Sequence, residues 1–353
     1  MYFRSGYTIG SAFIGCAVLS YKQVYMHTEN SMTLPDFISG LRTKLQSVLG
    51  DSSPHGALQG RASGPALFAE LLESSPLSVF ITSRFGGRGQ HVHEALAMLE
   101  TLSYESLPLS LIAGINGALF LQPLSKYAPD ELQQEVFGQF LKQGALGGLM
   151  ITEPDFGSDA LSMRTSFREE DGQYRLRGTK HWGGLTGHAD YWLLTARGEN
   201  GAGELERNIS FFVWDRQIGG IEVQEYYRSL GLEVIPYGRN RIDALLPADR
   251  LLKPAGSGVR MLLDLLHRSR LQFPGMAMGF LRRMLDEARD HVRSRVVGGR
   301  TLSTYDQVQD RLAELQAAWT ACSAMCSYTT GVAGVGNDCS VLSLPANSIK
   351  SVI

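Results

Sequence analysis

The fold of this chain is decided at residues 151–162, "ITEPDFGSDALS", where the hydrophobic pattern changes. An apolar run stops there at Pro154, and acids, glycine and serine follow it. Glu153 precedes the proline, which favours extended backbone, and Gly157 can take a positive φ that keeps the following amides out of a strand ladder. Such a segment offers N–H and hydroxyl donors to a flat polar group or a phosphate. A structural turn between two domains is the alternative.

The composition narrows the class of protein. The 353 residues are 44% hydrophobic and 19% charged, with a net charge of -2 and no basic run, so we expect two or three globular domains and no nucleic-acid partner. The four cysteines and eight histidines show no metal-ligand or disulfide spacing, which indicates no metal and a reducing, cytoplasmic setting. Residues 1–25 hold an apolar run that loosely resembles a signal peptide. Its glycines favour a first helix or an upstream extension, and it is too short for a membrane span.

The spacing of apolar residues changes twice along the chain. They recur every three or four positions up to about residue 147, every two positions from about 149 to 246, and every three or four again from 258. This order predicts an α+β fold. Its parts are an N-terminal helical domain (1–147), a central antiparallel β domain (148–250) and a C-terminal helical bundle (251–353).

Two local signals add detail to this fold. Asp171-Gly172 is expected at a hairpin tip, because a primed turn needs positive φ at both central residues. Asp130 with Gln133, just after a proline, is expected to form a capping box at the start of a helix.

The segment at 152–159, "TEPDFGSD", resembles the T-E-P-x-x-G-S-D signature of the acyl-CoA dehydrogenase family of flavoproteins. Further motifs of that family occur in the same order: "FGGRG" at 85–89, "LRGTKHW" at 176–182, "LGL" at 230–232, "LPADRLL" at 246–252 and "RVVGGRTLSTYDQVQDRLAEL" at 295–315. Several independent motifs in one order argue against coincidence. The resemblance covers roughly residues 76–315.

The resemblance implies an FAD-dependent oxidoreductase that carries out α,β-dehydrogenation of an acyl-CoA or acyl-carrier-protein thioester. Thr152 and nearby backbone amides would bind the pyrimidine edge of the flavin, with Ser158 and Arg270 beside the substrate. The family pairs subunits through the bundle, so we expect a homodimer or homotetramer in which Arg295 reaches the neighbour's flavin diphosphate. The implied cofactor positions are Met150, Thr152, Gly157, Ser158, Trp182, Gly183, Gly184, Thr186, Arg295 and Gly299.

The chain departs from the family at the catalytic base. In most of the family the base is a glutamate near the C-terminal end; in one branch it precedes an arginine on the first bundle helix, where this chain has Ser269 before Arg270. Neither position holds a carboxylate before Ile353, so we expect either a truncated sequence that lacks part of the bundle or a protein that is not a standard dehydrogenase. Asp264 and His267, three positions apart on one helical face, are candidates for a substitute acid/base pair.

A second departure follows Trp182. The family commonly has an Ile-Thr pair there whose threonine approaches flavin N5, whereas this chain has Gly183 and Gly184. One interpretation is a re-formed loop in which Thr186 supplies the hydroxyl. An open N5 region without a base would also suit a flavin-dependent monooxygenase on the same fold, which is the alternative function. A non-catalytic binding or assembly member is the third. The acyl chain and the electron acceptor are not indicated.

Overall fold

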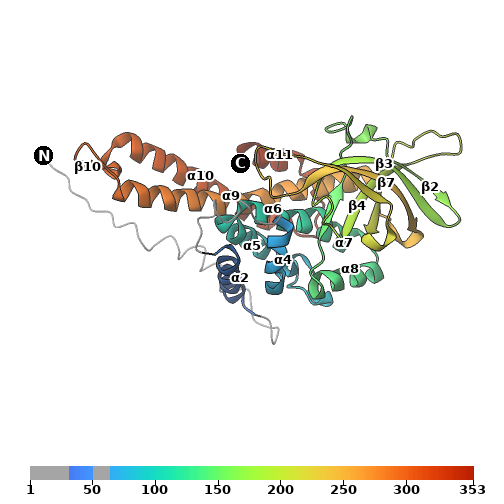
Figure 1. Ribbon diagram of the computed structural model, residues 1–353, viewed down its shortest axis with the longest axis horizontal. Coiled ribbons are helices and arrows are strands. Elements are labelled where there is room, and N and C mark those ends of the chain that lie inside the picture. Colours follow the sequence, from blue (N-terminus) through green and yellow to red (C-terminus); the bar gives the residue numbers. More distant parts are fainter. Residues whose placement is uncertain (1–31, 51–63) are drawn as a thin grey trace. The chain divides into compact units, whose positions relative to one another are not determined.

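Helices begin and end the described chain, and a mostly antiparallel sheet lies between them in sequence (Figure 1). The computed structural model describes residues 32–50 and 64–353, so the apolar run at 1–25 lies outside the described residues. Residues 34–353 form one unit. The α+β fold predicted from the sequence is confirmed.

The N-terminal part of this unit is built from helices. They are α2 (Leu34–Leu49), α4 (Gly64–Leu71), α5 (Val92–Glu105), α6 (Leu107–Asn116), α7 (Gln122–Tyr127) and α8 (Asp130–Lys142), with a π-helical turn η4 (Gly117–Leu121) between α6 and α7. Three short 3-10 turns connect them: η1 (Leu72–Ser74), η2 (Pro76–Phe80) and η3 (Ser83–Phe85). Their inward side chains, such as Leu41 and Leu99, belong to the main hydrophobic core.

The continuous helical stretch at residues 107–127 is long and apolar enough to resemble a membrane span. Its mean hydropathy reaches 1.5, yet 78% of that window is buried, as in the core helix of a folded domain. Glycines allow close packing here, because a Cβ on Gly117 would lie 2.3 Å from the Phe80 ring and one on Gly114 would lie 2.3 Å from Met276 Cε. This stretch therefore joins the first and last parts of the chain.

The predicted capping box at the start of α8 is wrong. The helix begins at Asp130 after Pro129, and no side chain caps it. Asp130 pairs instead with Arg84, with Nη2 2.6 Å from Oδ1. Gln133 Nε2 donates to the carbonyl of Ala128 at 2.8 Å. Asp130 is thus engaged by a distant residue, and Gln133 by a carbonyl just before the helix, so neither side chain forms the cap.

The central strands form one eight-stranded sheet of order β6-β7-β3-β2-β4-β5-β8, with β1 paired to β4 outside that path. The strands are β1 (Gly147–Met150), β2 (Ser166–Glu170), β3 (Gln173–Gly184), β4 (Tyr191–Gly198), β5 (Ser210–Asp215), β6 (Ile221–Tyr226), β7 (Tyr237–Pro247) and β8 (Leu251–Leu252). Short turns η5 (Ala160–Ser162), η6 (Arg216–Ile218) and η7 (Ala248–Arg250) lie between them. Only the β1–β4 and β2–β4 pairings of the described strands are parallel. Asp171 and Gly172, at the β2–β3 tip, have φ of 51° and 76°, which confirms the predicted turn.

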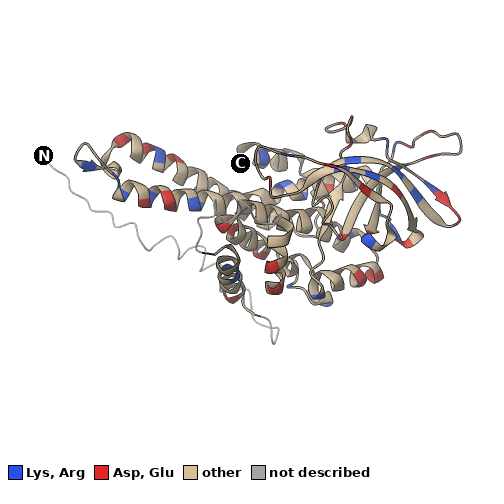
Figure 2. Ribbon diagram, viewed as in Figure 1, with Lys and Arg blue, Asp and Glu red and all other residues tan. Residues whose placement is uncertain are grey.

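The C-terminal part contains two long antiparallel helices and a short one. They are α9 (Gly258–Ser294), α10 (Asp306–Val332) and α11 (Ser343–Val352), with β9 (Val296–Val297), β10 (Arg300–Thr301) and η8 (Leu302–Thr304) between α9 and α10, and η9 (Cys339–Val341) before α11. Figure 1 shows α9 and α10 side by side, with their connecting hairpin at the end away from the sheet. In Figure 2 the acidic and basic residues of α10 lie near its hairpin end, and the rest of that helix is uncharged.

One hydrophobic core runs through all three parts, from Phe37 through Leu193 to Met276. We therefore propose 147/148 and 250/251 as boundaries between three parts of the chain that share one hydrophobic core.

A buried ion pair joins the segment after β1 to the sheet. Lys180 Nζ on β3 lies 2.9 Å from Glu153 Oε1, and the two side chains are 0% and 5% exposed. The ammonium also donates to the carbonyl of Ile151 at 2.9 Å and to the hydroxyl of Thr195 at 3.1 Å. The carboxylate accepts from the backbone N–H and hydroxyl of Thr165 at 2.9 and 2.5 Å. Both charges are thus surrounded by hydrogen-bond partners although they are shielded from water.

Burial acts against both members of this pair. It lowers the pKa of Lys180 to about 8, and Glu153 opposes part of that effect. Burial pushes the pKa of Glu153 upward, but Lys180 and the hydrogen bonds from Thr165 and Arg164 outweigh it and hold that pKa below its usual range. At neutral pH the carboxylate is ionised and the ammonium is mostly protonated, so the attraction between them fixes the exit of β1 against β3.

Removing one partner is expected to destabilise the fold strongly. Lys180→Met leaves a buried carboxylate unpaired and should lower the free energy of unfolding by about 3–5 kcal/mol in urea denaturation. The double variant with Glu153→Leu should recover part of this loss, since no buried charge remains. Arg168→Met is the control, because it breaks the exposed Arg168–Glu170 pair and should cost less than about 1 kcal/mol. Equal losses in the two single variants would contradict a structural role for the buried pair.

Candidate functional site

The signature segment, residues 151–162, makes a tight turn directly after β1. The backbone N–H of Glu153 donates to the carbonyl of Phe156 at 3.1 Å, and the reverse bond is 3.2 Å. The carbonyl of Thr152 accepts from the backbone N–H of His181 on β3 at 2.9 Å. Met150, at the end of β1, is buried, and its carbonyl accepts from the Thr195 hydroxyl at 3.1 Å. The base of the segment is therefore held on both sides.

The outer face of the same segment keeps free donors. Among the described residues, nothing accepts from the N–H or hydroxyl of Thr152, from the N–H of Gly157, or from the N–H or hydroxyl of Ser158. Gly157 does not take the positive φ expected from the sequence. A Cβ there would meet nothing within 4 Å, so the glycine leaves the backbone uncovered rather than enabling a turn. These donors are available to a ligand.

An aromatic platform stands next to these donors. Trp182 has a φ of 56°, which is strained for a large side chain, and the pairing of β3 with β7 is irregular between His181 and Gly183. Its indole is 51% exposed. The ring lies 4.7 Å from the Tyr227 ring and 6.1 Å from the Tyr237 ring, centroid to centroid. Since the preceding His181 is bonded to Thr152, Trp182 and Thr152 lie on neighbouring stretches of backbone.

Of the two glycines after Trp182, Gly184 is required by close packing and Gly183 is not. A Cβ on Gly184 would lie 2.9 Å from Ile115 Cδ1, whereas one on Gly183 would meet its nearest atom at 3.4 Å. The Thr186 hydroxyl is fully buried, donates to the Gly183 carbonyl at 2.8 Å and accepts from Asn240 Nδ2 at 3.0 Å. The expectation that Thr186 supplies a hydroxyl to the flavin therefore does not agree with the structure, because the loop itself uses that group.

A cavity of about 170 Å³ lies where the three parts of the chain meet. The sheet contributes Trp182, Gly184 and Tyr237 to its walls, and α6 with η4 contributes mainly apolar side chains. Helix α9 contributes Ser269 and Gln272, together with two apolar residues. None of the described residues that line the cavity is an aspartate, glutamate or histidine. Ser269 thus occupies the position expected for a base, at the cavity wall, with a hydroxyl in place of a carboxylate.

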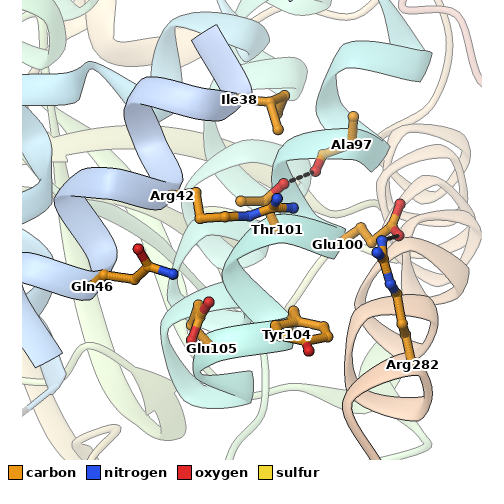
Figure 3. A pocket seen from close by; sticks show the side chains of 9 residues that line it. All are labelled: Ile38, Arg42, Gln46, Ala97, Glu100, Thr101, Tyr104, Glu105 and Arg282. Atoms are coloured by element: carbon orange, nitrogen blue, oxygen red, sulfur yellow. Dashed lines mark hydrogen bonds and ion pairs between the residues drawn. The ribbon is translucent and has the colours of Figure 1, made fainter. Parts of the chain in front are cut away.

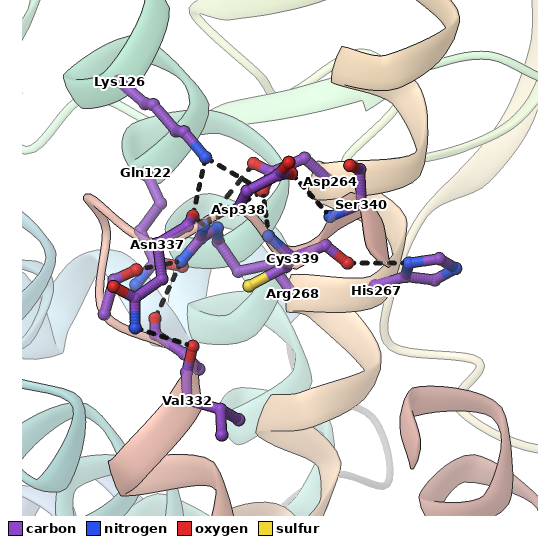
Figure 4. Close-up of polar contacts among 12 residues, drawn as sticks. Gln122, Lys126, Asp264, His267, Arg268, Val332, Asn337, Asp338, Cys339 and Ser340 are labelled. Carbon is purple, nitrogen blue, oxygen red and sulfur yellow. Dashed lines mark hydrogen bonds and ion pairs between the residues drawn. The ribbon is translucent and has the colours of Figure 1, made fainter. Parts of the chain in front are cut away.

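The predicted pair of Asp264 and His267 is not formed (Figure 4). Asp264 accepts from Lys126 Nζ and Tyr127 OH, both at 3.0 Å, and from Arg268 Nη2 at 3.2 Å. His267 Nδ1 lies 2.9 Å from the carbonyl oxygen of Cys339 instead. Both side chains are 2% exposed, and neither lines the cavity.

These buried groups tie α9 to the segment before α11. Arg268 donates to the carbonyls of Ala333 and Asn337 at 2.7 and 2.9 Å, and Asp264 accepts from the backbone N–H of Cys339 at 2.7 Å. Burial, with the nearby Asp264 carboxylate, raises the pKa of Tyr127, so its hydroxyl remains a donor. The hydrogen bonds of this network therefore hold helix α9 against the segment before α11.

The remaining positions singled out by the sequence lie along α9 and at its end. Arg270 is half-buried, and within the described residues its guanidinium has no hydrogen-bond or ion-pair partner. Arg295 is exposed beside the β9–β10 hairpin, whose tip residues Gly298 and Gly299 have φ of 58° and 81°. The glycine that replaces the family's phenylalanine is therefore explained by the turn it occupies.

Two further cavities lie outside this region. One, of about 390 Å³, is lined by residues 153–156 of the signature segment, including two carboxylates, and by Arg164 and Arg239. Arg239 pairs with Glu225 at 3.2 Å, but its Nε is buried and unpaired among the described groups. The other, of about 440 Å³, lies between α2, α5 and α9 and is lined by polar side chains such as Arg42 and Glu100 (Figure 3). No residue singled out by the sequence lines this third cavity.

Sequence reasoning missed two contributors to the region. Tyr227 supports the indole from a segment that carried no motif. Gln272 looks like an ordinary polar helix residue, although it lies four positions after Arg268 on the buried face of α9. That spacing was the one signal that could have marked it.

Comparisons with known proteins agree with this geometry. The family model described as acyl-CoA dehydrogenase, middle domain, matches residues 148–245, and the C-terminal domain model matches residues 256–340. A probable acyl-CoA dehydrogenase, fadE25, from Mycobacterium leprae is 25% identical over 80% of this chain and 73% of its own length. Benzylmalonyl-CoA dehydrogenase from Aromatoleum aromaticum is 27% identical over 73% of this chain and 67% of its own. The structure of butyryl-CoA dehydrogenase from Megasphaera elsdenii is similar with a TM-score of 0.81 and 19% identity, covering 93% of this chain and 85% of that one.

Asp264 is predicted to act in stability. Asp264→Asn removes the charge that pairs with buried Arg268, and the free energy of unfolding should fall by about 3–5 kcal/mol, measured by urea denaturation. Glu314→Gln on exposed α10, which breaks a pair with Arg311, is the control and should change it by less than about 1 kcal/mol. An unchanged stability together with a loss of any pH-dependent catalytic step would show that Asp264 belongs to an acid/base pair after all.

Proposed function

This chain belongs to the acyl-CoA dehydrogenase family, and we propose that it is an FAD-dependent oxidoreductase that acts on an acyl thioester at the cavity between α6, β3 and α9. The observation that carries the proposal is the set of free donors at Thr152, Gly157 and Ser158, of which Thr152 is bonded to the residue that precedes the exposed Trp182. Thr152 is half-buried, where most polar groups are paired within a protein, whereas Gly157 and Ser158 are exposed to whatever binds at the surface. A row of unpaired donors next to an aromatic plane supports binding of a flat, polar ring.

The residues present fit FAD. Thr152 and the amides of Gly157 and Ser158 would donate to the polar edge of the ring, and Trp182 would cover its plane. FAD, when bound, accepts the hydride that leaves the substrate. Because Glu153 is held by Lys180 beneath the segment, these donors would keep their positions as negative charge develops. Thr186 and Met150 would act as supports, since their polar groups are already used.

The acyl group would occupy the cavity, with the thioester near Ser269 and Arg270. The half-buried guanidinium of Arg270 has no partner in the described chain, which supports a role in binding substrate. Coenzyme A is the proposed carrier, because the unpaired Nε of Arg239 and the cation of Arg164 face a second cavity large enough for a phosphate-bearing group. An acyl-carrier-protein thioester is the alternative carrier.

One observation favours a second function. The cavity walls contain no carboxylate or imidazole among the described residues, so the group that would remove the α-proton is missing from them. A flavin-dependent monooxygenase needs no such base, and this supports that chemistry as the second candidate. A non-catalytic binding or assembly member would show no bound flavin.

A carboxylate at position 269 is predicted to increase dehydrogenation. FAD-loaded protein is mixed with butyryl-CoA without oxygen, and the loss of flavin absorbance is followed with time. Ser269→Glu should bleach about 10²–10⁴ times faster than the wild type, which is the usual contribution of a positioned base. Ser269→Gln, which has the same shape without the base, should stay slow.

The outcomes separate the candidate functions. Bleaching of the wild type as fast as that of Ser269→Glu would show that another group supplies the base. Oxygen consumption that requires an added reductant, with no bleaching by thioester, would favour the monooxygenase. Protein that binds no FAD at saturating FAD concentration would support the third candidate, a non-catalytic binding or assembly member.

The position of Arg295 supports an oligomer. Arg295 follows Ser269 by 26 residues, about 39 Å along an α-helix at 1.5 Å per residue. This length separates it from the cavity of its own chain, so only a second chain would bring an Arg295 to a bound flavin. Exposed apolar side chains near it, Val296 and Val297 at 56% and 45% exposure, are what an interface between copies would cover.

We predict two or four chains per particle. Light scattering of the FAD-loaded protein at micromolar concentration measures this, and a monomer would contradict the proposal. Arg295→Gln should weaken FAD binding about 10- to 100-fold, the effect of losing a charge-assisted hydrogen bond. The particle size should not change. Arg311→Gln on exposed α10 is the matched control and should leave FAD binding unaltered.

A further inference from the structure

The apolar cavity is lined by one buried acceptor that has no hydrogen-bond partner in the described part of the chain. Gln272 on α9 lines the cavity and is 3% exposed. Its Nε2 donates to Gln122 Oε1 at 2.8 Å, and its Oε1 is buried with no hydrogen-bond partner among the described residues. Ser269, one turn earlier on the same helix, also lines the cavity, and its hydroxyl is likewise unpaired within the described chain. The other α9 residues at this wall, Phe273 and Met276, are apolar.

An unpaired carbonyl oxygen in such a place has a cost. A buried acceptor left without a donor destabilises the folded protein by about 1–3 kcal/mol. The low dielectric of an apolar cavity increases this destabilisation. Water can satisfy Gln272 while the cavity is empty of substrate. A plain hydrocarbon chain would displace that water and leave the oxygen unpaired. A leucine or methionine would suit a hydrocarbon chain better than this glutamine does.

Gln122 holds the amide group of Gln272 in place through one hydrogen bond. It lies on α7 and is itself 3% exposed, so the hydrogen bond between the two amides is shielded from water. Gln122 engages one N–H of Gln272 Nε2, and Oε1 is the amide atom that stays buried without a partner among the described residues, so it is the atom that most needs a ligand donor. Gln122 is thus a positioning residue for Gln272.

The cavity is also small. Its volume of about 170 Å³ lies below the ~300–1,000 Å³ typical of pockets that enclose drug-sized ligands. It suits a compact group rather than a long chain.

We propose, on the basis of the acyl-thioester function proposed above, that the substrate's acyl group is short and carries a hydroxyl or N–H donor, which Gln272 Oε1 accepts. Gln272 is then a specificity-determining residue of the acyl pocket. It selects a functionalised acyl group over the plain alkyl chain of equal length, and Ser269 can pair with a second polar atom of the same group.

Binding of matched thioesters tests this proposal. Butyryl-CoA, 3-hydroxybutyryl-CoA, 4-hydroxybutyryl-CoA and 4-methoxybutyryl-CoA are titrated calorimetrically, without oxygen, into the FAD-loaded protein. At least one hydroxy ester should bind the wild type about 3- to 10-fold more tightly than butyryl-CoA, the effect of one neutral hydrogen bond. The methoxy ester, which cannot donate, should show no such gain. In Gln272→Leu and Gln272→Met the preference should vanish or reverse, and Gln134→Leu on the exposed face of α8 should keep it.

Other results would overturn the proposal. Equal affinities of the wild type for hydroxy and plain esters would show that Gln272 does not determine specificity. The proposed acyl-thioester function would not be affected by that result. A preference for the methoxy ester would show that the wall presents a donor. A hydroxyl preference that survives in both Gln272 variants would assign it to another residue. Failure of the wild type to bind any of the four esters would overturn the proposed function together with this inference.

Discussion

The buried pair of Lys180 and Glu153 is the constraint on which the rest of this structure depends. The two side chains come from segments that no local pattern would bring together, and each is surrounded by further polar groups of the sheet. Breaking such a pair strongly destabilises the fold, because the remaining charge is buried away from water without an opposite charge. The pair therefore holds the exit of β1 in one place. Everything the signature segment can offer to a ligand follows from that position.

With Glu153 turned inward, the signature segment keeps unpaired donors at its surface, together with the exposed carboxylates of Asp155 and Asp159. Thr152, Gly157 and Ser158 are left unpaired there, while the strained Trp182 presents its ring next to them. The cavity below is closed by a glycine-rich stretch of helix on one side and by α9 on the other. The cofactor region and the acyl cavity are thus parts of one surface. The buried charges further along α9 are separate from it and serve the packing of that helix.

Much of this arrangement could be predicted from the sequence, since it rests on short-range signals. The period-two stretch gave the sheet, and the Asp171-Gly172 turn followed from its need for positive φ. Two of the failures involve polar side chains whose partners lie far away in sequence. Asp130 was assigned to a helix cap but binds Arg84, and Asp264 was paired with His267 but binds Lys126 and Arg268. Gln272 carried no motif, because an unpaired acceptor is visible only once the walls around it are known.

The central claim is that the ion pair keeps the signature-segment donors free for the flavin, and residue-resolved amide hydrogen exchange tests it most directly. Without FAD, the N–H groups of Thr152, Gly157 and Ser158 should exchange quickly, while those of Thr165 and His181, which are bonded within the protein, should exchange slowly. Saturating FAD should slow exchange at the first three positions. Protection of those three amides before FAD is added, or no change when it binds, would contradict the account.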